Sequence, residues 1–224
     1  LTVLNDVIHA FRMQVFFVIS GYFSYMLYLR YQPQRWLKVR VERVAIPMLT
    51  AVPLLTLPQF FLLKDWTAAV GDWPSFSLYD KYNALAWNLI SHLWFLLVLV
   101  LLTTLSLLTF RILRDFGYRR AEKTDYSELN WTKLTLSFIA FGLIWGTIRR
   151  LLFIFQPDLL RDALFNFAVM QTLFYLPFFM LGALTWKHEA IKALLVKFNP
   201  WTLVGAAVAF IAYMLNQRYN VGEG

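Results

Sequence analysis

Long apolar stretches separated by short polar loops run the length of this chain. A helix that crosses the hydrocarbon core of a bilayer needs about 20 mainly apolar residues. Signals typical of β-strands are absent from the sequence. The pattern therefore predicts an all-α fold, a polytopic membrane helix bundle with about six transmembrane helices. The six predicted spans are residues 11–29, 44–63, 89–110, 134–155, 170–186 and 201–215.

The loops between these spans alternate between rich and poor in basic residues. The loops after the first, third and fifth spans hold five, six and three lysines and arginines, whereas the loops after the second and fourth hold two and one. Loops rich in Lys and Arg stay in the cytoplasm. The alternation therefore predicts a bacterial inner-membrane protein with the first residue of the chain on the periplasmic side.

The chain reads as one membrane domain over residues 1–224, because it has no long linker and no visible internal repeat. The first span would start outside the cell, yet no signal peptide precedes it. We therefore expect the domain to be incomplete, with at least one helix upstream and more helices downstream.

Composition narrows the classes of function. The chain is 59% hydrophobic and 15% charged, whereas soluble domains carry about a quarter charged residues. The net charge of +8 suits cytoplasmic loops that face anionic lipid, and no soluble fold is present to offer a basic surface to nucleic acid. No cysteine is present, which excludes thiolate chemistry and disulfides. The three scattered histidines give no expectation of a metal site.

Ionisable residues inside or near the apolar spans are the first candidates for chemistry. Asp6, His9 and Arg12 are spaced by three residues and would share one side of a helix that starts before residue 11. In that arrangement Asp6 can orient His9 as a catalytic base, and Arg12 can bind an anionic group. The alternative is a helix start with polar residues at the lipid head groups.

Arg149 and Arg150 lie in the periplasmic half of the fourth predicted span, roughly 8 Å below its end. Their position opposes the usual preference of basic residues for the cytoplasmic side. Neighbouring helix positions point about 100° apart, so at least one arginine is expected to face the bundle interior or a wet cavity, with a substrate carboxylate, a sugar or an acidic side chain as its partner. The alternative is that both extend to the membrane surface.

Two further groups lie at the predicted periplasmic side. His92 follows Ser91 at the start of the third span, where it can act as a general base or simply lie at the interface. Gln171 and Tyr175 are four residues apart in the fifth span, so they either line a polar path or bond to each other.

Arg40 and Arg43 lie in the basic loop before the second span. They can anchor the chain to anionic lipid, or they can bind the phosphates of a cytoplasmic ligand such as coenzyme A. In the first span, Ser20 is about 16 Å along the axis from His9, too far for a catalytic pair. Ser20 and Gly21 instead predict close packing against another helix.

Several motifs resemble the membrane acyltransferase-3 family. Residues 16–21 read Phe-Phe-Val-Ile-Ser-Gly, similar to the family's Phe-Phe-x-x-Ser-Gly signature. Residues 40–47 are similar to its Arg-x-x-Arg-x-x-x-Pro segment, and residues 92–96 to its Trp-Phe-Leu motif. The segments that resemble the branch of the family acting on osmoregulated periplasmic glucans are residues 11–17, 77–83, 169–179 and 215–219.

This resemblance implies an O-succinyltransferase that needs no bound cofactor. Succinyl-CoA from the cytoplasm would be the acyl donor, and its partners would be acyl-CoA, a periplasmic glucan and membrane lipids, with no nucleic acid. The family carries an arginine and, some ten residues later, a histidine in an earlier helix. Nothing in this sequence matches that pair, so the resemblance implies that these 224 residues alone are catalytically incomplete.

The residues alone favour a transporter or flippase for an anionic or sugar-linked substrate, with a structural membrane subunit as a further alternative. The resemblance favours the acyltransferase instead. The catalytic candidates are Arg149, Arg150, His92 and His9. The substrate-binding candidates are Arg12, Arg40, Arg43, Gln171 and Tyr175.

Overall fold

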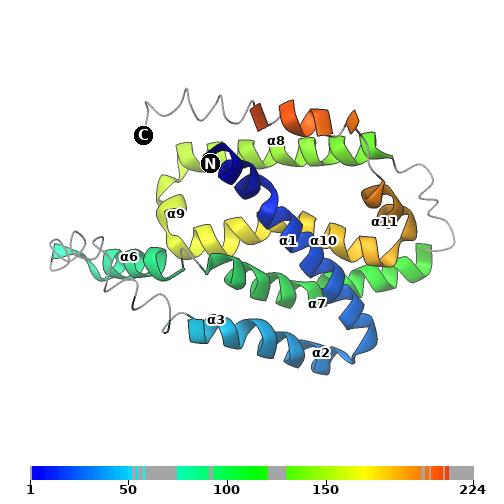
Figure 1. Ribbon diagram of the computed structural model, residues 1–224. Coiled ribbons are helices and arrows are strands. Elements are labelled where there is room, and N and C mark those ends of the chain that lie inside the picture. Colours follow the sequence, from blue (N-terminus) through cyan, green and yellow to red (C-terminus); the bar gives the residue numbers. More distant parts are fainter. Residues whose placement is uncertain are drawn as a thin grey trace.

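The computed structural model describes residues 2–51, 54, 58, 75–90, 93–120, 130–197, 200, 201, 203–208, 210 and 211. Side chains are described for these residues except 2–10, 85, 88, 89 and 112–120. Every element in this part of the chain is helical, and no strand occurs among these residues, as the apolar pattern predicts (Figure 1).

The helices follow one another with short connections. In chain order they are α1 (Thr2–Arg30), α2 (Pro33–Arg40), the π-helical turn η1 (Val41–Ala45), α3 (Ile46–Ala51), α6 (Leu78–Ile90), α7 (Trp94–Arg120), α8 (Trp131–Phe155), α9 (Pro157–Arg161), the π-helical turn η5 (Phe165–Met170), α10 (Gln171–Lys187) and α11 (Glu189–Val196). In the described part of the chain, three helices are long and apolar enough to cross a membrane. They cover Trp94–Arg111, Trp131–Phe155 and Phe165–Lys187.

The third, fourth and fifth predicted spans exist, but their first residues differ from the prediction. The third begins at Trp94 rather than at residue 89, because α6 continues through Ile90. The fourth begins at Trp131, three residues early, because the Asn130 side chain caps the helix by accepting the Lys133 N–H at 2.9 Å. The fifth begins at Phe165 instead of residue 170, since Asp162 accepts the Phe165 N–H at 2.7 Å.

Of the other three predicted spans, one is described in full and two only in part. The first is contained in the longer α1, which begins at Thr2. The apolar pattern predicts that the second span begins at residue 44. The helix already starts at Pro33, because the fixed φ angle of proline suits the first position of a helix. Most of residues 52–63 and 212–215 lie outside the described residues, so the ends of the second and sixth spans stay predictions.

The closest helix contact joins α1 and α10, which cross in the centre of the bundle (Figure 1). A Cβ added to Gly21 would overlap the backbone carbonyl of Phe179, and one added to Gly182 would overlap the backbone of Val18 and Tyr22. The two backbones therefore touch with no side chain between them, as small residues allow in membrane bundles. The close packing predicted at Gly21 is confirmed.

A cluster of buried aromatic rings surrounds this crossing. Trp36, Phe110 and Phe179 are fully buried and come from α2, α7 and α10. The Phe110 and Phe179 rings are stacked with centroids 6.1 Å apart. The Trp36 Nε1–H donates to the Ser24 carbonyl at 3.0 Å, so α2 folds back onto the end of α1. This contact places the basic loop residues 35–43 beside α7 rather than away from the bundle.

Ring contacts give the relative directions of the helices. Phe16 contacts Phe95 and Tyr25 contacts Phe110, so α1 and α7 run parallel. Phe17 contacts Tyr175 and Tyr22 contacts Trp186, so α1 and α10 also run parallel.

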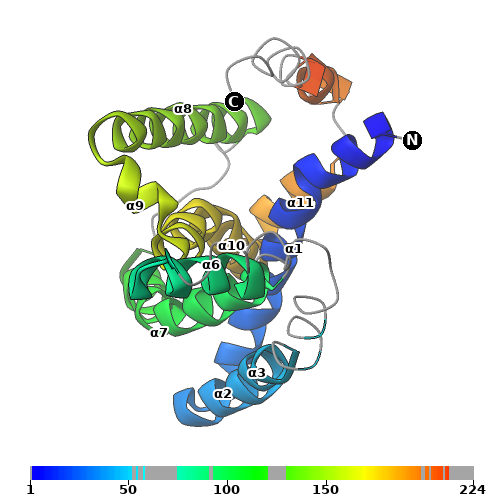
Figure 2. The ribbon, with the colours of Figure 1, turned by 90° about the vertical axis from the view of Figure 1, so that its left-hand side faces the viewer.

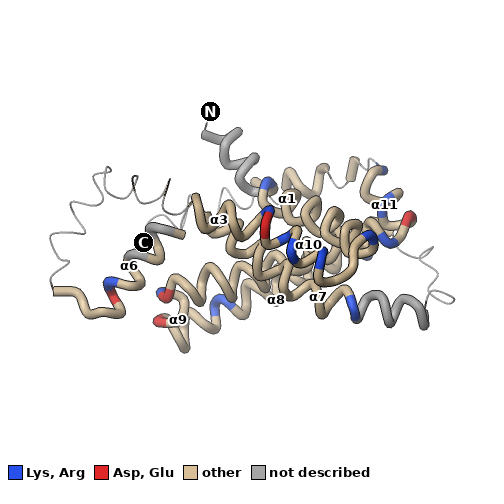
Figure 3. Tube along the Cα trace, turned by 90° about the horizontal axis from the view of Figure 1, so that it is seen from below, with Lys and Arg blue, Asp and Glu red and all other residues tan. Residues whose placement is uncertain are grey.

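By contrast, α8 runs antiparallel to α10, since Phe138 contacts Phe178 whereas Trp145 contacts Phe174. These are the relations that alternating spans require. Figure 3 shows charged residues of α6 and α9 at one end of the molecule and charged residues of α11, of both signs, at the other. Which end faces the cytoplasm stays a prediction.

The glycine contact can be tested with one added methyl group. Gly21→Ala and Gly182→Ala should each destabilise the folded protein by about 1–3 kcal/mol, because backbone must move to admit the Cβ. Gly142→Ala is the matched control, since a Cβ there meets nothing within 4 Å. It should be neutral or should stabilise α8 by about 1 kcal/mol. Thermal unfolding in detergent measures all three, and equal melting temperatures would contradict the packing.

The orientation can be tested by labelling in intact cells. The chain has no cysteine, so Arg120→Cys and Ser77→Cys each introduce a single reactive thiol. An impermeant maleimide should label Ser77→Cys from outside and Arg120→Cys only after the inner membrane is opened. Labelling of both from outside would contradict every inside and outside assignment.

Candidate active site between α8 and α10

A cavity of about 280 Å³ lies between α8 and α10, next to the α9–η5 connection. Its walls are formed by Trp145 and Arg149 from α8, Leu160 from α9, Asn166 and Met170 from η5, and Gln171, Phe174 and Tyr175 from α10. By the predicted topology this is the periplasmic end of the bundle.

Aromatic side chains hold α8 away from α10 and leave room for the cavity. Trp145 and Phe141 both contact the Phe174 ring, with centroids 5.7 and 5.9 Å apart. No residue of α8 is buried, and the helix lies apart from α7 and α10 (Figure 2). The α8–α10 interface is therefore built from long side chains, unlike the backbone contact between α1 and α10.

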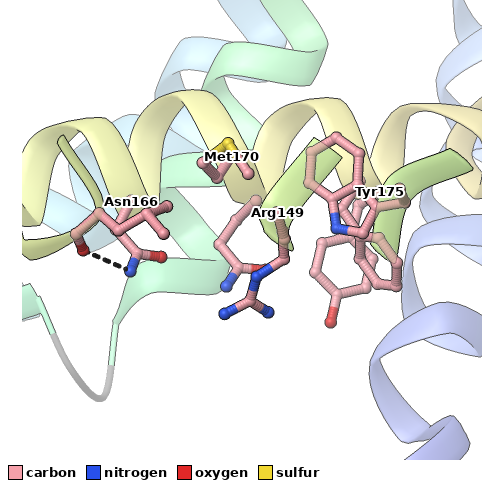
Figure 4. Close-up of a pocket in the computed structure, with 8 residues that line it drawn as sticks. Arg149, Asn166, Met170 and Tyr175 are labelled. Atoms are coloured by element: carbon pink, nitrogen blue, oxygen red, sulfur yellow. Dashed lines mark hydrogen bonds between the residues drawn. The ribbon is translucent and has the colours of Figure 1, made fainter. Parts of the chain in front are cut away.

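Arg149 is the one charged side chain among the described residues in the wall of the cavity. It extends from α8 into the space between Asn166 and Tyr175 (Figure 4). Within the described part of the chain, Arg149 forms no ion pair or hydrogen bond. An arginine at membrane depth is costly unless a charged or polar group compensates it. The cavity is therefore suited to an anionic or strongly polar ligand.

Gln171 and Tyr175 line this cavity together with Arg149, so the structure brings three of the sequence candidates to one site. Their spacing of four residues puts both on one face of α10. Tyr175 is buried. Asn166, which also lines the cavity, donates a hydrogen bond from its amide to the Leu160 carbonyl at 3.2 Å. The spacing allows Gln171 and Tyr175 either to line a polar path or to bond to each other, and in the structure both line the cavity. Their role in binding stays a prediction.

Asn166 and Trp145 belong to the site but were not among the sequence candidates. Asn166 precedes Gln171 by five residues, and α-helical spacing would separate the two around the helix axis. The π-helical turn η5 closes at the fifth residue instead, which brings them to one face. Turns of this kind are frequent at functional sites. Trp145 precedes Arg149 by one helical turn, and this spacing could have indicated from the sequence that both face the same side of α8.

Arg150 faces away from the cavity. It borders an open groove on the opposite side of α8 together with Gly142, Gly146 and Thr147. The expectation that at least one arginine of the pair faces inward therefore holds for Arg149. Arg150 does not line this cavity, and the catalytic role predicted for it stays a prediction.

Among the candidates at the start of α1, only Arg12 has a described side chain. Arg12 is exposed on α1 and lines no part of the site. Asp6 and His9 belong to the first turns of α1, which confirms that the helix starts before residue 11, but their side chains lie outside the described ones. His92 lies outside the described residues altogether, so the roles predicted for both histidines stay predictions.

Arg40 and Arg43 form a second basic feature, where α2 and η1 pack against α7. Arg40 is partly buried, and its Nε and one Nη atom have no hydrogen-bond partner among the described residues. Burial, followed by the charge of Arg43, lowers the pKa of Arg40 to about 10. Arg43 is exposed. A partly buried guanidinium with free donors in the described structure, beside a second arginine, is suited to an anion such as phosphate.

Hydrogen bonds from α6 fix the α9–η5 connection that forms one wall of the cavity. Asn83 donates to the Arg161 carbonyl at 2.9 Å and accepts the Ala163 N–H at 2.7 Å. Trp87 Nε1–H also donates to the Arg161 carbonyl, and the Tyr79 hydroxyl donates to Asp162. The bond to Asp162 is the main cause that raises the pKa of Tyr79. This network positions Leu160 and Asn166 from outside the site.

These features define a polytopic helical membrane protein with a cationic cavity between two of its helices. The chain matches the family described as Acyltransferase domain over residues 1–221, and it belongs to that acyltransferase-3 family. The resemblance seen in the sequence motifs is confirmed. Within the residues that the structure describes, no group of three His, Asp or Glu side chains is placed to hold a metal.

The chain is also similar to individual named proteins of this family. Glucans biosynthesis protein C from Salmonella schwarzengrund (strain CVM19633) and from Salmonella heidelberg (strain SL476) are each 57% identical to this chain over 223 residues. The match covers 100% of this chain and 58% of each relative, so the chain spans little more than half the length of these proteins. No solved structure matches the chain.

The two arginines of α8 should respond differently to substitution by lysine. In the full-length protein, Arg149→Lys should lower acyl transfer by at least about tenfold, or about 1.4 kcal/mol, because lysine cannot form a planar bidentate contact. Arg150→Lys should retain activity, since its groove requires only a long cationic side chain. Transfer by membranes is measured per amount of folded protein. Full activity of both variants and of the double variant would exclude a role for the pair.

Proposed function

We propose that this chain is part of a membrane acyltransferase that transfers succinyl groups from cytoplasmic succinyl-CoA to osmoregulated periplasmic glucans. Family membership supports the acyl transfer, and the name of the relatives supports the glucan. The observation that carries the proposal is a pair of guanidinium groups, Arg40 and Arg149, which lie in different parts of the bundle and have no acidic partner among the residues that the structure describes. One can serve the donor and the other the acyl group or its acceptor.

The donor would bind at Arg40 and Arg43. Coenzyme A carries several phosphates, and the guanidinium group matches phosphate oxygens through paired hydrogen bonds. Arg40 lies on α2, which packs against α7, and its Nε and one Nη atom are buried without a partner among the described residues. Such partial burial restricts the side chain before a ligand arrives, which favours binding. Its lowered pKa of about 10 still leaves it cationic at neutral pH.

In the transfer step, a glucan hydroxyl oxygen attacks the thioester carbonyl carbon. The new C–O bond of the ester forms, the C–S bond breaks, and the hydroxyl proton ends on the thiol of coenzyme A. A cation near the developing oxyanion and a base near the hydroxyl both accelerate such a reaction. Arg149 supplies a cation next to the cavity, and His9 and His92 remain the candidates for the base.

A transporter or flippase would use the same arginines, and no further observation favours it. The two functions differ in whether a covalent bond forms. Full-length protein in vesicles, supplied with labelled succinyl-CoA on the cytoplasmic face and glucan on the other, should place label in the glucan as an ester. Vesicles that move a substrate but never acylate the glucan would overturn the proposal.

The donor site gives a sharper prediction in the same assay. Arg40→Ala with Arg43→Ala should raise the KM for succinyl-CoA by about tenfold or more, because contacts with charged groups contribute about 1.5–3 kcal/mol, and should leave the KM for glucan nearly unchanged. Arg35→Ala is the matched control. It removes a neighbouring cation that lies over the Tyr31 ring, 5.2 Å from its centroid. An unchanged donor KM in the double variant would make these arginines lipid anchors.

A further inference from the structure

We infer that the cavity between α8 and α10 is the site that selects the acyl group, with Arg149 binding the free terminal carboxylate of a succinyl chain. This inference rests on the proposed function and adds to it a recognition site for one part of the donor. It explains why an acyltransferase would place an arginine at membrane depth, where a neutral acyl chain would leave it unpaired.

The charge of the cavity is the first argument. Among the described residues that line it, Arg149 is the only charged side chain, and none of them is an aspartate or glutamate. A neutral sugar would leave this charge uncompensated at membrane depth, whereas a carboxylate neutralises it and accepts two parallel hydrogen bonds from the guanidinium.

The remaining polar groups fit the same ligand. Gln171 offers an amide and Tyr175 a hydroxyl, and both can donate to an anionic oxygen. Arg149 lies between Asn166 and Tyr175, so its guanidinium has polar side chains on both sides (Figure 4).

The apolar walls account for the rest of the acyl chain. Trp145, Leu160, Met170 and Phe174 surround the polar groups and can cover the two methylene groups of succinate. The cavity volume of about 280 Å³ is at the small end of ligand sites, which suits a short acyl group rather than an oligosaccharide. The larger acceptor would approach from outside the cavity.

The test compares two donors that differ in one group. Succinyl-CoA and butyryl-CoA share the coenzyme and the acyl length, but succinyl ends in a carboxylate where butyryl ends in a methyl group. Both donors are supplied together to the full-length protein with glucan, and the ratio of succinyl to butyryl transfer is measured. Because both products come from the same sample, partial misfolding of a variant cancels from this ratio.

We expect Arg149→Leu to lower the ratio of succinyl to butyryl transfer by about tenfold or more, since a contact with a charged group is lost for one donor only. Arg149→Lys should lower it less, because the charge is kept. Arg150→Leu is the matched control on the other face of α8 and should leave the ratio unchanged. An unchanged ratio in Arg149→Leu would overturn the inference, even if both transfers slowed together.

Failure of the proposed function and binding of lipid each give a distinct result. Wild-type protein that transfers no succinyl group would refute the proposed function itself, whereas normal succinyl transfer with an unchanged ratio in Arg149→Leu refutes only the selector. An anionic lipid head group is the other source of a compensating charge. The ratio of succinyl to butyryl transfer is therefore measured for wild type and Arg149→Leu in vesicles with phosphatidylglycerol and in vesicles of phosphatidylcholine alone. If the variant differs from wild type only in the vesicles with phosphatidylglycerol, Arg149 binds lipid and the inference is wrong.

Discussion

The backbone contact between α1 and α10 is the constraint on which the rest of the bundle depends. Gly21 and Gly182 remove the side chains that would keep the two helices apart, so the contact cannot shift by small adjustments. Rings such as Phe110 and Phe179 then fill the space around the crossing and join α7 and α2 to it. The position of α10, and therefore of every cavity residue it carries, follows from this contact.

The two sides of α10 are packed in opposite ways, and this difference produces the site. One side meets α1 through glycine, whereas the other meets α8 through rings such as Trp145 and Phe174. Large rings separate the helix axes, and the π-helical turn before α10 turns Asn166 toward the resulting space. Hydrogen bonds from α6 then hold the connection at the end of that space. The cavity therefore lies outside the dense core, and hydrogen bonds hold the α9–η5 wall in place.

An enzyme that joins a cytoplasmic donor to a periplasmic acceptor must bind anions in two places within one apolar body. Under the proposed function, Arg40 and Arg149 would supply these two places, since Arg40 lies on α2, which packs on α7, and Arg149 enters the cavity. Arg40 is partly buried and Arg149 is exposed at the cavity, and in the described part of the chain neither has an acidic partner. An arginine at membrane depth is costly without a compensating group, so binding of an anion would relieve part of that cost.

The sequence by itself determined the helical class, the family and the alternation of helix directions, because apolar length, short motifs and loop charge are local properties. It also indicated Arg149, Gln171 and Tyr175, since charge at membrane depth and helical spacing can be read along one helix. Only the tertiary structure decided that Arg149 rather than Arg150 enters the cavity and that Asn166 joins it. Those outcomes depend on the rotation of α8 against α10 and on a π-helical turn, which are set by packing between distant segments.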